Sequence, residues 1–148
     1  MKVARLLGSR TVPVIVNASA GWLRGASLTT RAGQVASAFR RAVLSPDLHI
    51  VTPERLGRAV WEARVRGATV VFVGGGDGTI STAAGILAGT RTALGVLPLG
   101  TRNHFALDLG LALDLPRAVA AYAVGELQAI DVADVNGRTF VNNLSLGL

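Results

Sequence analysis

The chain has 148 residues, half of them hydrophobic, no cysteine and a net charge of +6 at pH 7. This length suits one domain with a sizeable core, and the lack of cysteine excludes disulfides and thiolate metal sites. No run of about 18–20 apolar residues predicts a membrane span, and residues 1–10 do not have the pattern of a signal peptide, so we expect a cytoplasmic protein.

The positive charge lies mainly in the first half of the chain. Residues 1–70 carry 11 basic and 3 acidic side chains, whereas residues 71–148 carry 4 and 6. Such a basic half suits a nucleotide, an anionic membrane surface, nucleic acid or simply solvated helix faces. Because no aromatic residues alternate with the arginines as in a base-stacking surface, we expect no nucleic-acid partner. Peripheral membrane contact and a homodimer remain open.

The first predicted elements are a strand and a helix joined by a polar loop. Residues 1–11 are expected to be an irregular arm. The apolar run Val12–Val16 predicts a buried strand, with Pro13 marking its beginning or a sheet edge. A loop of small and polar residues follows from Asn17 to Gly21. An amphipathic helix is then predicted from the apolar positions Leu28, Val35, Phe39 and Ala42.

A second strand and helix come next. Leu48–Val51 predicts the strand, and Thr52-Pro53 begins a helix with Thr52 at the N-cap and Pro53 at the first helical position. Gly67 is expected to end this helix. The hydroxyl of Thr52 is either a cap alone or also a phosphate ligand, because it follows the carboxyl end of a strand.

A glycine-rich loop follows the third predicted strand. The sequence Val70-Val71-Phe72-Val73-Gly74-Gly75-Gly76-Asp77-Gly78-Thr79 reads as a buried strand, a tight loop and the start of a helix. The helix is indicated by Ile80, Ala83, Ala84 and Leu87. Glycines let a backbone approach a ligand closely, and free N–H groups at a helix start suit a phosphate. A turn with only a structural role is the alternative.

Two well-known phosphate loops do not fit this stretch. A P-loop requires a lysine after its last glycine, and the only lysine of the chain is Lys2. The dinucleotide fingerprint requires glycine at its sixth place, which here is Thr79 when counted from Gly74.

The fourth predicted strand, Ala93–Leu97, ends in a second small and polar loop around Gly100-Thr101-Arg102-Asn103. A helix is expected after Asp114-Leu115-Pro116. Strands that alternate with helices predict an α/β fold of three layers, a parallel sheet with helices on both faces. All four strand-end loops would then lie at one edge of the sheet, where such folds bind ligands.

The last part of the chain has a different pattern. Ile130–Val135 and Thr139–Val141 flank Asn136-Gly137, which is a strong hairpin signal. We therefore expect residues 1–125 to form the α/β domain and residues 126–148 to begin a second, truncated β-rich domain.

These motifs together resemble the diacylglycerol kinase catalytic domain family, within the superfamily that also contains NAD kinases. Gly74–Thr79 matches the glycine loop of that family in full, and Leu97–Ala106 resembles its Pro-Leu-Gly-Thr-x-Asn-x-Phe-Ala block, which NAD kinases lack. Asn17–Gly21 and Thr52 resemble further nucleotide-contacting positions. Ile130-Asp131 and Phe140-Val141-Asn142 resemble the passage into a β-sandwich domain. The likeness is greatest to the bacterial diacylglycerol and sphingoid-base kinase branch.

The resemblance implies an ATP-dependent lipid kinase with a nucleotide-binding domain like that of NAD kinases, using ATP and Mg²⁺ and a lipid hydroxyl as acceptor. Asp77 would be catalytic, and would hold Mg²⁺ directly or through water, or assist the hydroxyl; capping the helix that follows is its alternative role. The nucleotide-binding residues would be Asn17, Thr52, Gly74, Gly75, Gly76, Asp77, Gly78, Thr79, Gly100, Thr101 and Asn103.

Two departures from the family pattern bear on activity. Ser81-Thr82 stand where the family usually has Asn-Glu, and Arg102 replaces a small residue. The resemblance also implies that a catalytic glutamate and Mg²⁺-binding acids come from the second domain. Two other functions stay open: a kinase for NAD or another small molecule, and a nucleotide sensor without catalysis, which the loss of the glutamate favours. This fragment alone is expected to be inactive.

Overall fold

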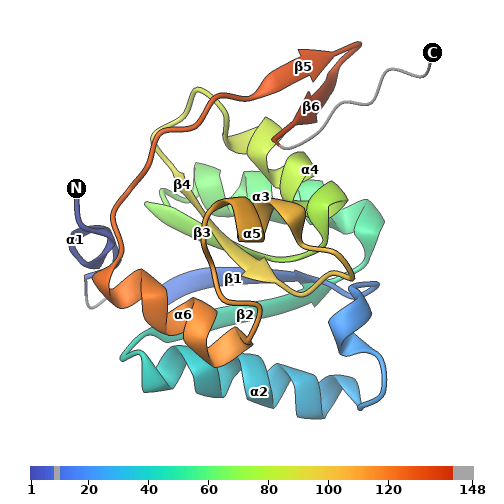
Figure 1. Cartoon of the computed structure of the whole chain (residues 1–148), viewed down its shortest axis with the longest axis vertical. Coiled ribbons are helices and arrows are strands. Elements are labelled where there is room, and N and C mark those ends of the chain that lie inside the picture. The colour runs from blue at the N-terminus through green and yellow to red at the C-terminus, as the bar shows by residue number, and fades with distance from the viewer. Residues whose placement is uncertain (9–10, 142–148) are drawn as a thin grey trace.

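A computed structural model describes residues 1–8 and 11–141 of the chain. Its centre is a parallel sheet in the order β2-β1-β3-β4 (Figure 1). The strands are β1 (Thr11–Asn17), β2 (Ser45–Val51), β3 (Val70–Gly75) and β4 (Ala93–Pro98). All six residues of β3 are buried, as expected for a central strand covered on both faces.

Helices cover both faces of this sheet and produce two apolar clusters. One face carries α2 (Leu28–Arg41) and α6 (Leu115–Val124), with Phe39 and Val119 among the buried residues. The other face carries α3 (Pro53–Val65) and α4 (Asp77–Leu87), with Val60 and Ile80 buried. The predicted three-layer α/β fold is therefore confirmed. None of the described helices is long and apolar enough to cross a membrane.

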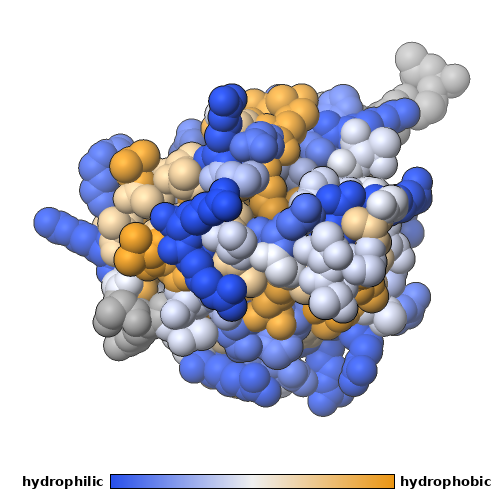
Figure 2. Space-filling view, turned by 90° about the horizontal axis from the view of Figure 1, so that it is seen from below, coloured by the Kyte–Doolittle hydropathy of each residue, from blue (hydrophilic) through white to orange (hydrophobic). Residues whose placement is uncertain are grey.

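The outer surface of the α2 layer is largely polar, as an amphipathic helix requires. Figure 2, seen from below Figure 1, shows hydrophilic residues spread over this side with smaller hydrophobic areas between them. Val35, Ala38 and Phe39 face the sheet, while Arg40 and Arg41 in the last turn are exposed. The two arginines lie at the negative end of the helix dipole, which stabilises them there.

The expected irregular arm before the first strand was wrong, whereas Pro13 lies near the beginning of its strand, as expected. The start of the chain forms a short helix, α1 (Val3–Leu7), because Val3 and Leu7 lie one turn apart and are buried in the cluster that includes α6. Pro13 lies inside β1, which is a central strand. Pairing of β1 with β3 begins only at Val14, so the missing N–H of Pro13 interrupts no bond between these strands.

The predicted helix ends and the hairpin are confirmed. Gly67 follows α3 in the left-handed conformation, with φ of 88°. The carboxylate of Asp114 accepts the backbone N–H of Arg117 and caps α6. Strands β5 (Ala133–Val135) and β6 (Arg138–Phe140) form an antiparallel hairpin around Asn136 and Gly137, both with positive φ.

The hairpin packs against α4 at a glycine. A Cβ added to Gly85 would lie 2.7 Å from Oγ1 of Thr139 in β6, so the close approach requires a residue without a side chain. The expected β-sandwich domain stays a prediction, because residues 142–148 lie outside the described residues.

Candidate functional site

The four loops singled out from the sequence lie at the carboxyl edge of the sheet. The strand order places Thr52 after the outer strand β2, then Asn17 at the end of β1, then Gly76–Thr79 after β3. The loop Gly100–Asn103 follows β4 on the other side of β3. This edge is where open α/β sheets bind ligands.

Asn17 connects the first loop to the glycine loop. Its Nδ2 donates to Oγ1 of Thr79 at 2.9 Å, across 62 residues of sequence. Its Oδ1 accepts the backbone N–H of Ser19 at 2.9 Å, which orders the turn after β1. Both polar ends of the amide are therefore used in holding two loops together.

Asp77 connects the glycine loop to the loop after β4. Its Oδ1 accepts the backbone N–H of Phe105 at 2.9 Å, and its Oδ2 accepts that of His104 at 3.1 Å. These two N–H groups begin the short helix α5 (His104–Asp108), which sequence reasoning did not predict. Asp77 therefore caps α5; the alternative role as cap of α4 is wrong, because Gly76 occupies that N-cap position.

Asn103 holds the second loop in a fixed shape. It is 7% exposed and has φ of 55°, a left-handed conformation that asparagine tolerates better than most residues. Its Oδ1 accepts the N–H of Gly100 at 2.8 Å, and its Nδ2 donates to the carbonyl of Gly100 at 2.8 Å. Asn103 thus orders the loop that follows β4.

The glycines of the two loops divide into two groups. An added Cβ on Gly100 would lie 2.1 Å from Cα of Gly76, and one on Gly75 would lie 2.7 Å from the side chain of Thr79. A Cβ on Gly74 would lie 2.7 Å from Cδ1 of Leu99. These three residues are glycine because the two loops pack backbone against backbone or against side chains.

Gly76 and Gly78 have no such constraint from the described residues. A Cβ on Gly76 would meet only Cα of Gly100 at an ordinary 3.5 Å, and a Cβ on Gly78 would meet nothing within 4 Å. Neither residue has a positive φ. Their lack of a side chain is therefore explained neither by packing nor by conformation, and it leaves the backbone at the start of α4 open to a ligand.

The two threonines outside the glycine loop differ in their surroundings. Thr52 is at the N-cap of α3, where its side chain accepts no capping bond, and its hydroxyl favours the charged form of Glu54. The pKa of Glu54 is lowered, first by its own backbone N–H and then by this hydroxyl. Thr101 is exposed and approaches the turn η1 (Gly21–Leu23), where its Oγ1 would lie 3.1 Å from a Cβ on Gly21.

A cleft of about 910 Å³ lies between α4, the start of α5 and the hairpin. Asp77, Thr82, Arg102 and His104 line one side. Thr82 donates its hydroxyl to the carbonyl of Gly78 at 3.1 Å, one turn back along α4. The hairpin contributes Asp134 and Arg138, which sequence reasoning missed because only the packing of β6 on α4 brings them here.

No group of three or more potential metal-ligating side chains occurs within residues 1–8 and 11–141. The cleft brings the carboxylates of Asp77 and Asp134 to opposite walls. Both carboxylates already accept backbone N–H groups, Asp134 from Gly137 at 3.1 Å. Among the described residues, the cleft therefore offers single carboxylates and not a group of three ligands.

Comparison with known proteins agrees with this architecture. A "Probable lipid kinase YegS-like" from Klebsiella pneumoniae (strain 342) is 41% identical over 106 residues, covering 68% of this chain and 36% of that protein. One from Enterobacter sp. (strain 638) is 42% identical over 94 residues, covering 61% and 31%. A diacylglycerol kinase structure from Bacillus anthracis str. Sterne matches with a TM-score of 0.67 and 29% identity, covering 88% of this chain and 45% of that one.

The chain therefore spans about a third of the length of these curated relatives and under half of the solved structure. The family model described as "Diacylglycerol kinase catalytic domain" matches residues 11–135. This range includes all four strands of the parallel sheet and the four loops at its carboxyl edge. The chain belongs to the diacylglycerol kinase catalytic domain family.

Proposed function

We propose that this chain is the nucleotide-binding part of an ATP-dependent lipid kinase, which transfers the γ-phosphoryl group of ATP to the hydroxyl of diacylglycerol or a sphingoid base. The observation that carries this proposal is the pair Gly76 and Gly78. Nothing in the described structure requires glycine at these positions. A ligand that approaches the backbone closely, as a phosphate does, supplies the missing reason.

The nucleotide phosphates would bind at the N-terminus of α4. This helix has 11 residues, and the N–H groups of its first turn have no partner within the helix. Thr79 and Thr101 offer hydroxyl donors on either side, and Asn17 and Asn103 fix the loops that carry them. Thr52 lies farther along the same edge, beyond β1, so it would contact another part of the nucleotide.

Asp77 is the residue that we assign to Mg²⁺ and to the transferring phosphoryl group. Each of its oxygens accepts one backbone N–H and keeps a further lone pair for water or a metal. Mg²⁺ is commonly held by one or two carboxylates together with water and substrate phosphates. When bound, the ion would neutralise phosphate charge, while this chain positions the nucleotide.

The acceptor side of the site is expected to come from the part of the kinase that this chain does not contain. The resemblance implies a second domain with a catalytic glutamate and further acids. The cleft beside the hairpin would be where the two domains meet. A lipid acceptor requires contact with a membrane surface, to which the arginines of residues 1–70 would contribute.

The test is transfer of radiolabelled phosphate from ATP by the full-length kinase, with diacylglycerol, a sphingoid base and NAD offered as competing acceptors. We expect a labelled lipid and no labelled NAD. Residues 1–148 alone should bind ATP weakly and transfer nothing, because half of the cleft would be absent. Transfer to NAD only would identify the small-molecule kinase instead, and ATP binding without any transfer by the full-length protein would identify the sensor.

A further inference from the structure

Arg102 lies in a loop whose backbone is held in place by its neighbours. The side chain of Asn103 accepts the N–H of Gly100 and donates to the carbonyl of Gly100, which closes these residues into a tight turn. The backbone of Gly100 lies against that of Gly76, since a Cβ added to Gly100 would clash with Cα of Gly76. The backbone of Arg102 is therefore held close to the start of α4.

The same loop is joined to Asp77 just after Arg102. His104 donates its backbone N–H to Oδ2 of Asp77 at 3.1 Å. Arg102, His104 and Asp77 line one cleft, together with Gly78 in the first turn of α4. Because Asp77 is the residue assigned to the transferring phosphoryl group, the positive charge of Arg102 lies in the cleft where transfer would take place.

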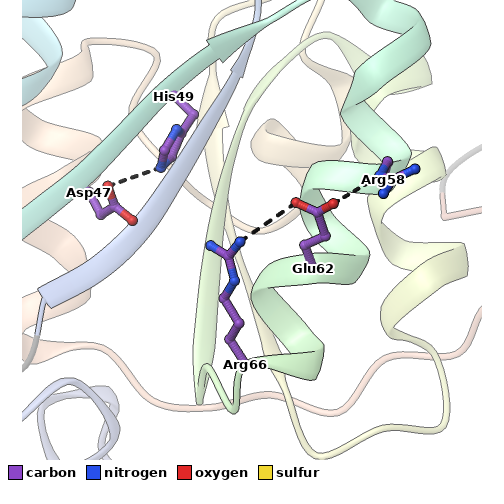
Figure 3. A network of polar contacts seen from close by, with 5 residues as sticks. All are labelled: Asp47, His49, Arg58, Glu62 and Arg66. Atoms are coloured by element: carbon purple, nitrogen blue, oxygen red, sulfur yellow. Dashed lines mark hydrogen bonds and ion pairs between the residues drawn. The ribbon is translucent and has the colours of Figure 1, made fainter.

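The guanidinium of Arg102 has no protein partner in the described part of the chain. No hydrogen bond or ion pair of this side chain is found within residues 1–8 and 11–141, although the carboxylates of Asp77 and Asp134 line the same cleft. On α3, by contrast, Arg58 and Arg66 share the carboxylate of Glu62, with N–O distances of 2.8 and 3.9 Å (Figure 3). The donors of Arg102 are therefore available to a ligand in the cleft.

The cleft also contains Arg138, which lies farther from the proposed phosphate site. The hairpin that carries Arg138 packs against α4 at Gly85. Gly85 follows Asp77 by eight residues, which is about 12 Å along the helix axis. The loop that carries Arg102 instead meets the backbone at Gly76, directly before the helix. Arg102 is thus the better placed of the two for a phosphate at the N-terminus of α4.

A guanidinium supplies what the other phosphate ligands of this site do not. The backbone N–H groups of α4 and the hydroxyls of Thr79 and Thr101 are neutral donors. The guanidinium stays charged and offers parallel N–H groups that match two oxygens of a phosphate. During phosphoryl transfer, negative charge is spread over the equatorial oxygens of the transferred group, where an arginine stabilises it. The chemistry of Arg102 therefore suits the terminal phosphate of the nucleotide.

We propose that Arg102 binds the γ-phosphoryl group of ATP and there stabilises its negative charge during transfer. This inference rests on the proposed function and adds a residue that contacts the substrate. In the transfer, the oxygen of the lipid hydroxyl bonds to the γ-phosphorus, and the bond from that phosphorus to the β–γ bridging oxygen breaks. ADP leaves with the bridging oxygen and the electron pair, the hydroxyl proton passes to a carboxylate of the site, and Arg102 keeps its own protons.

The test compares ATP with ADP, which lacks the γ-phosphoryl group. Each nucleotide is titrated with Mg²⁺ into the full-length kinase in a calorimeter. Arg102→Ala should weaken ATP binding about tenfold or more, because charge-assisted hydrogen bonds are lost, and should leave ADP binding within about threefold. Arg102→Lys keeps the charge but not the planar fork, so its affinity for ATP should lie between those of Arg102→Ala and the unaltered kinase.

Arg91→Ala is the matched control. It removes the same charge from an exposed position just before β4, at the opposite edge of the sheet from the loop that follows this strand. Arg91→Ala should leave both affinities and the rate of transfer to lipid unchanged, whereas Arg102→Ala should lower kcat by about 10²–10³. Both side chains are exposed, and urea unfolding checks that each variant is as stable as the unaltered kinase.

Two binding results would overturn the assignment of Arg102: an equal loss of affinity for ATP and ADP in Arg102→Ala, or no loss for either. The transfer assay distinguishes this failure from that of the proposed function. A kinase that phosphorylates lipid equally well with and without Arg102 contradicts only the role of this residue. A kinase that loses affinity for ATP alone in Arg102→Ala, but transfers nothing to lipid in its unaltered form, contradicts only the proposed function.

Discussion

Gly100→Ala is expected to destabilise the domain by about 2–3 kcal/mol, because overpacking of a well-packed contact typically costs 1–3 kcal/mol. The added Cβ would lie 2.1 Å from Cα and 2.6 Å from N of Gly76, so the two loops would have to separate. Unlike a flexible side chain, a backbone cannot rotate away. Urea unfolding measures the loss, and ATP binding should weaken with it because the same shift moves the glycine loop.

Gly33→Ala is the matched control for this prediction. Gly33 lies in α2, and an added Cβ there would meet nothing within 4 Å. Because alanine favours the helix over glycine, this variant should gain about 0.5–1 kcal/mol of stability. If Gly100→Ala unfolds at the same urea concentration as the unaltered chain, the backbone contact between the two loops is not as described.

The second large effect is expected from Asp77→Asn. An asparagine can accept one of the two N–H groups of α5 but would turn an NH₂ group toward the other. A donor left unpaired costs about 1–3 kcal/mol of stability. Loss of the negative charge beside the transferring phosphoryl group should lower the rate of phosphate transfer by the full-length kinase by about 10²–10⁴.

Asp114→Asn is a control that separates the capping role of Asp77 from its proposed catalytic role. Asp114 also caps a helix through its carboxylate, accepting the N–H of Arg117, but it lies at the start of α6. Its variant should lose a similar or smaller amount of stability, measured by urea unfolding, and keep full transfer activity. Equal activity in the Asp77 and Asp114 variants would show that Asp77 is a cap and nothing more.

Much of the fold could be predicted because local signals agreed with tertiary structure. The apolar run Val70–Val73 is buried on both faces, and Gly67, Asp114 and Asn136-Gly137 occupy the turn and cap positions that their chemistry favours. The helix α1 was missed because its five residues are too few for a clear period, and it is held by packing in the same cluster as α6.

The sequence predicts where the candidate site lies but not the contacts between its loops. Parallel strands place their carboxyl ends together, so the four loops could be assigned to one edge. Asp77 caps α5 although it lies 27 residues before His104 in the sequence. This contact depends on how two loops pack, so no local sequence signal predicts it. The same holds for Gly85, whose neighbour is Thr139 in the hairpin, and for Arg138 at the cleft.

The most direct measurement of the central claim is calorimetric titration of ATP against Gly78→Ala. Gly78 lies in the first turn of α4 with open space at its Cβ position, so alanine should raise the free energy of unfolding by about 0.5–1 kcal/mol. If the nucleotide phosphates approach this backbone, the added methyl group should weaken ATP binding at least about tenfold. The corresponding loss of binding free energy is of the size that overpacking of a close contact costs. A Gly78→Ala chain that is more stable and binds ATP as tightly as the unaltered chain would contradict the phosphate site.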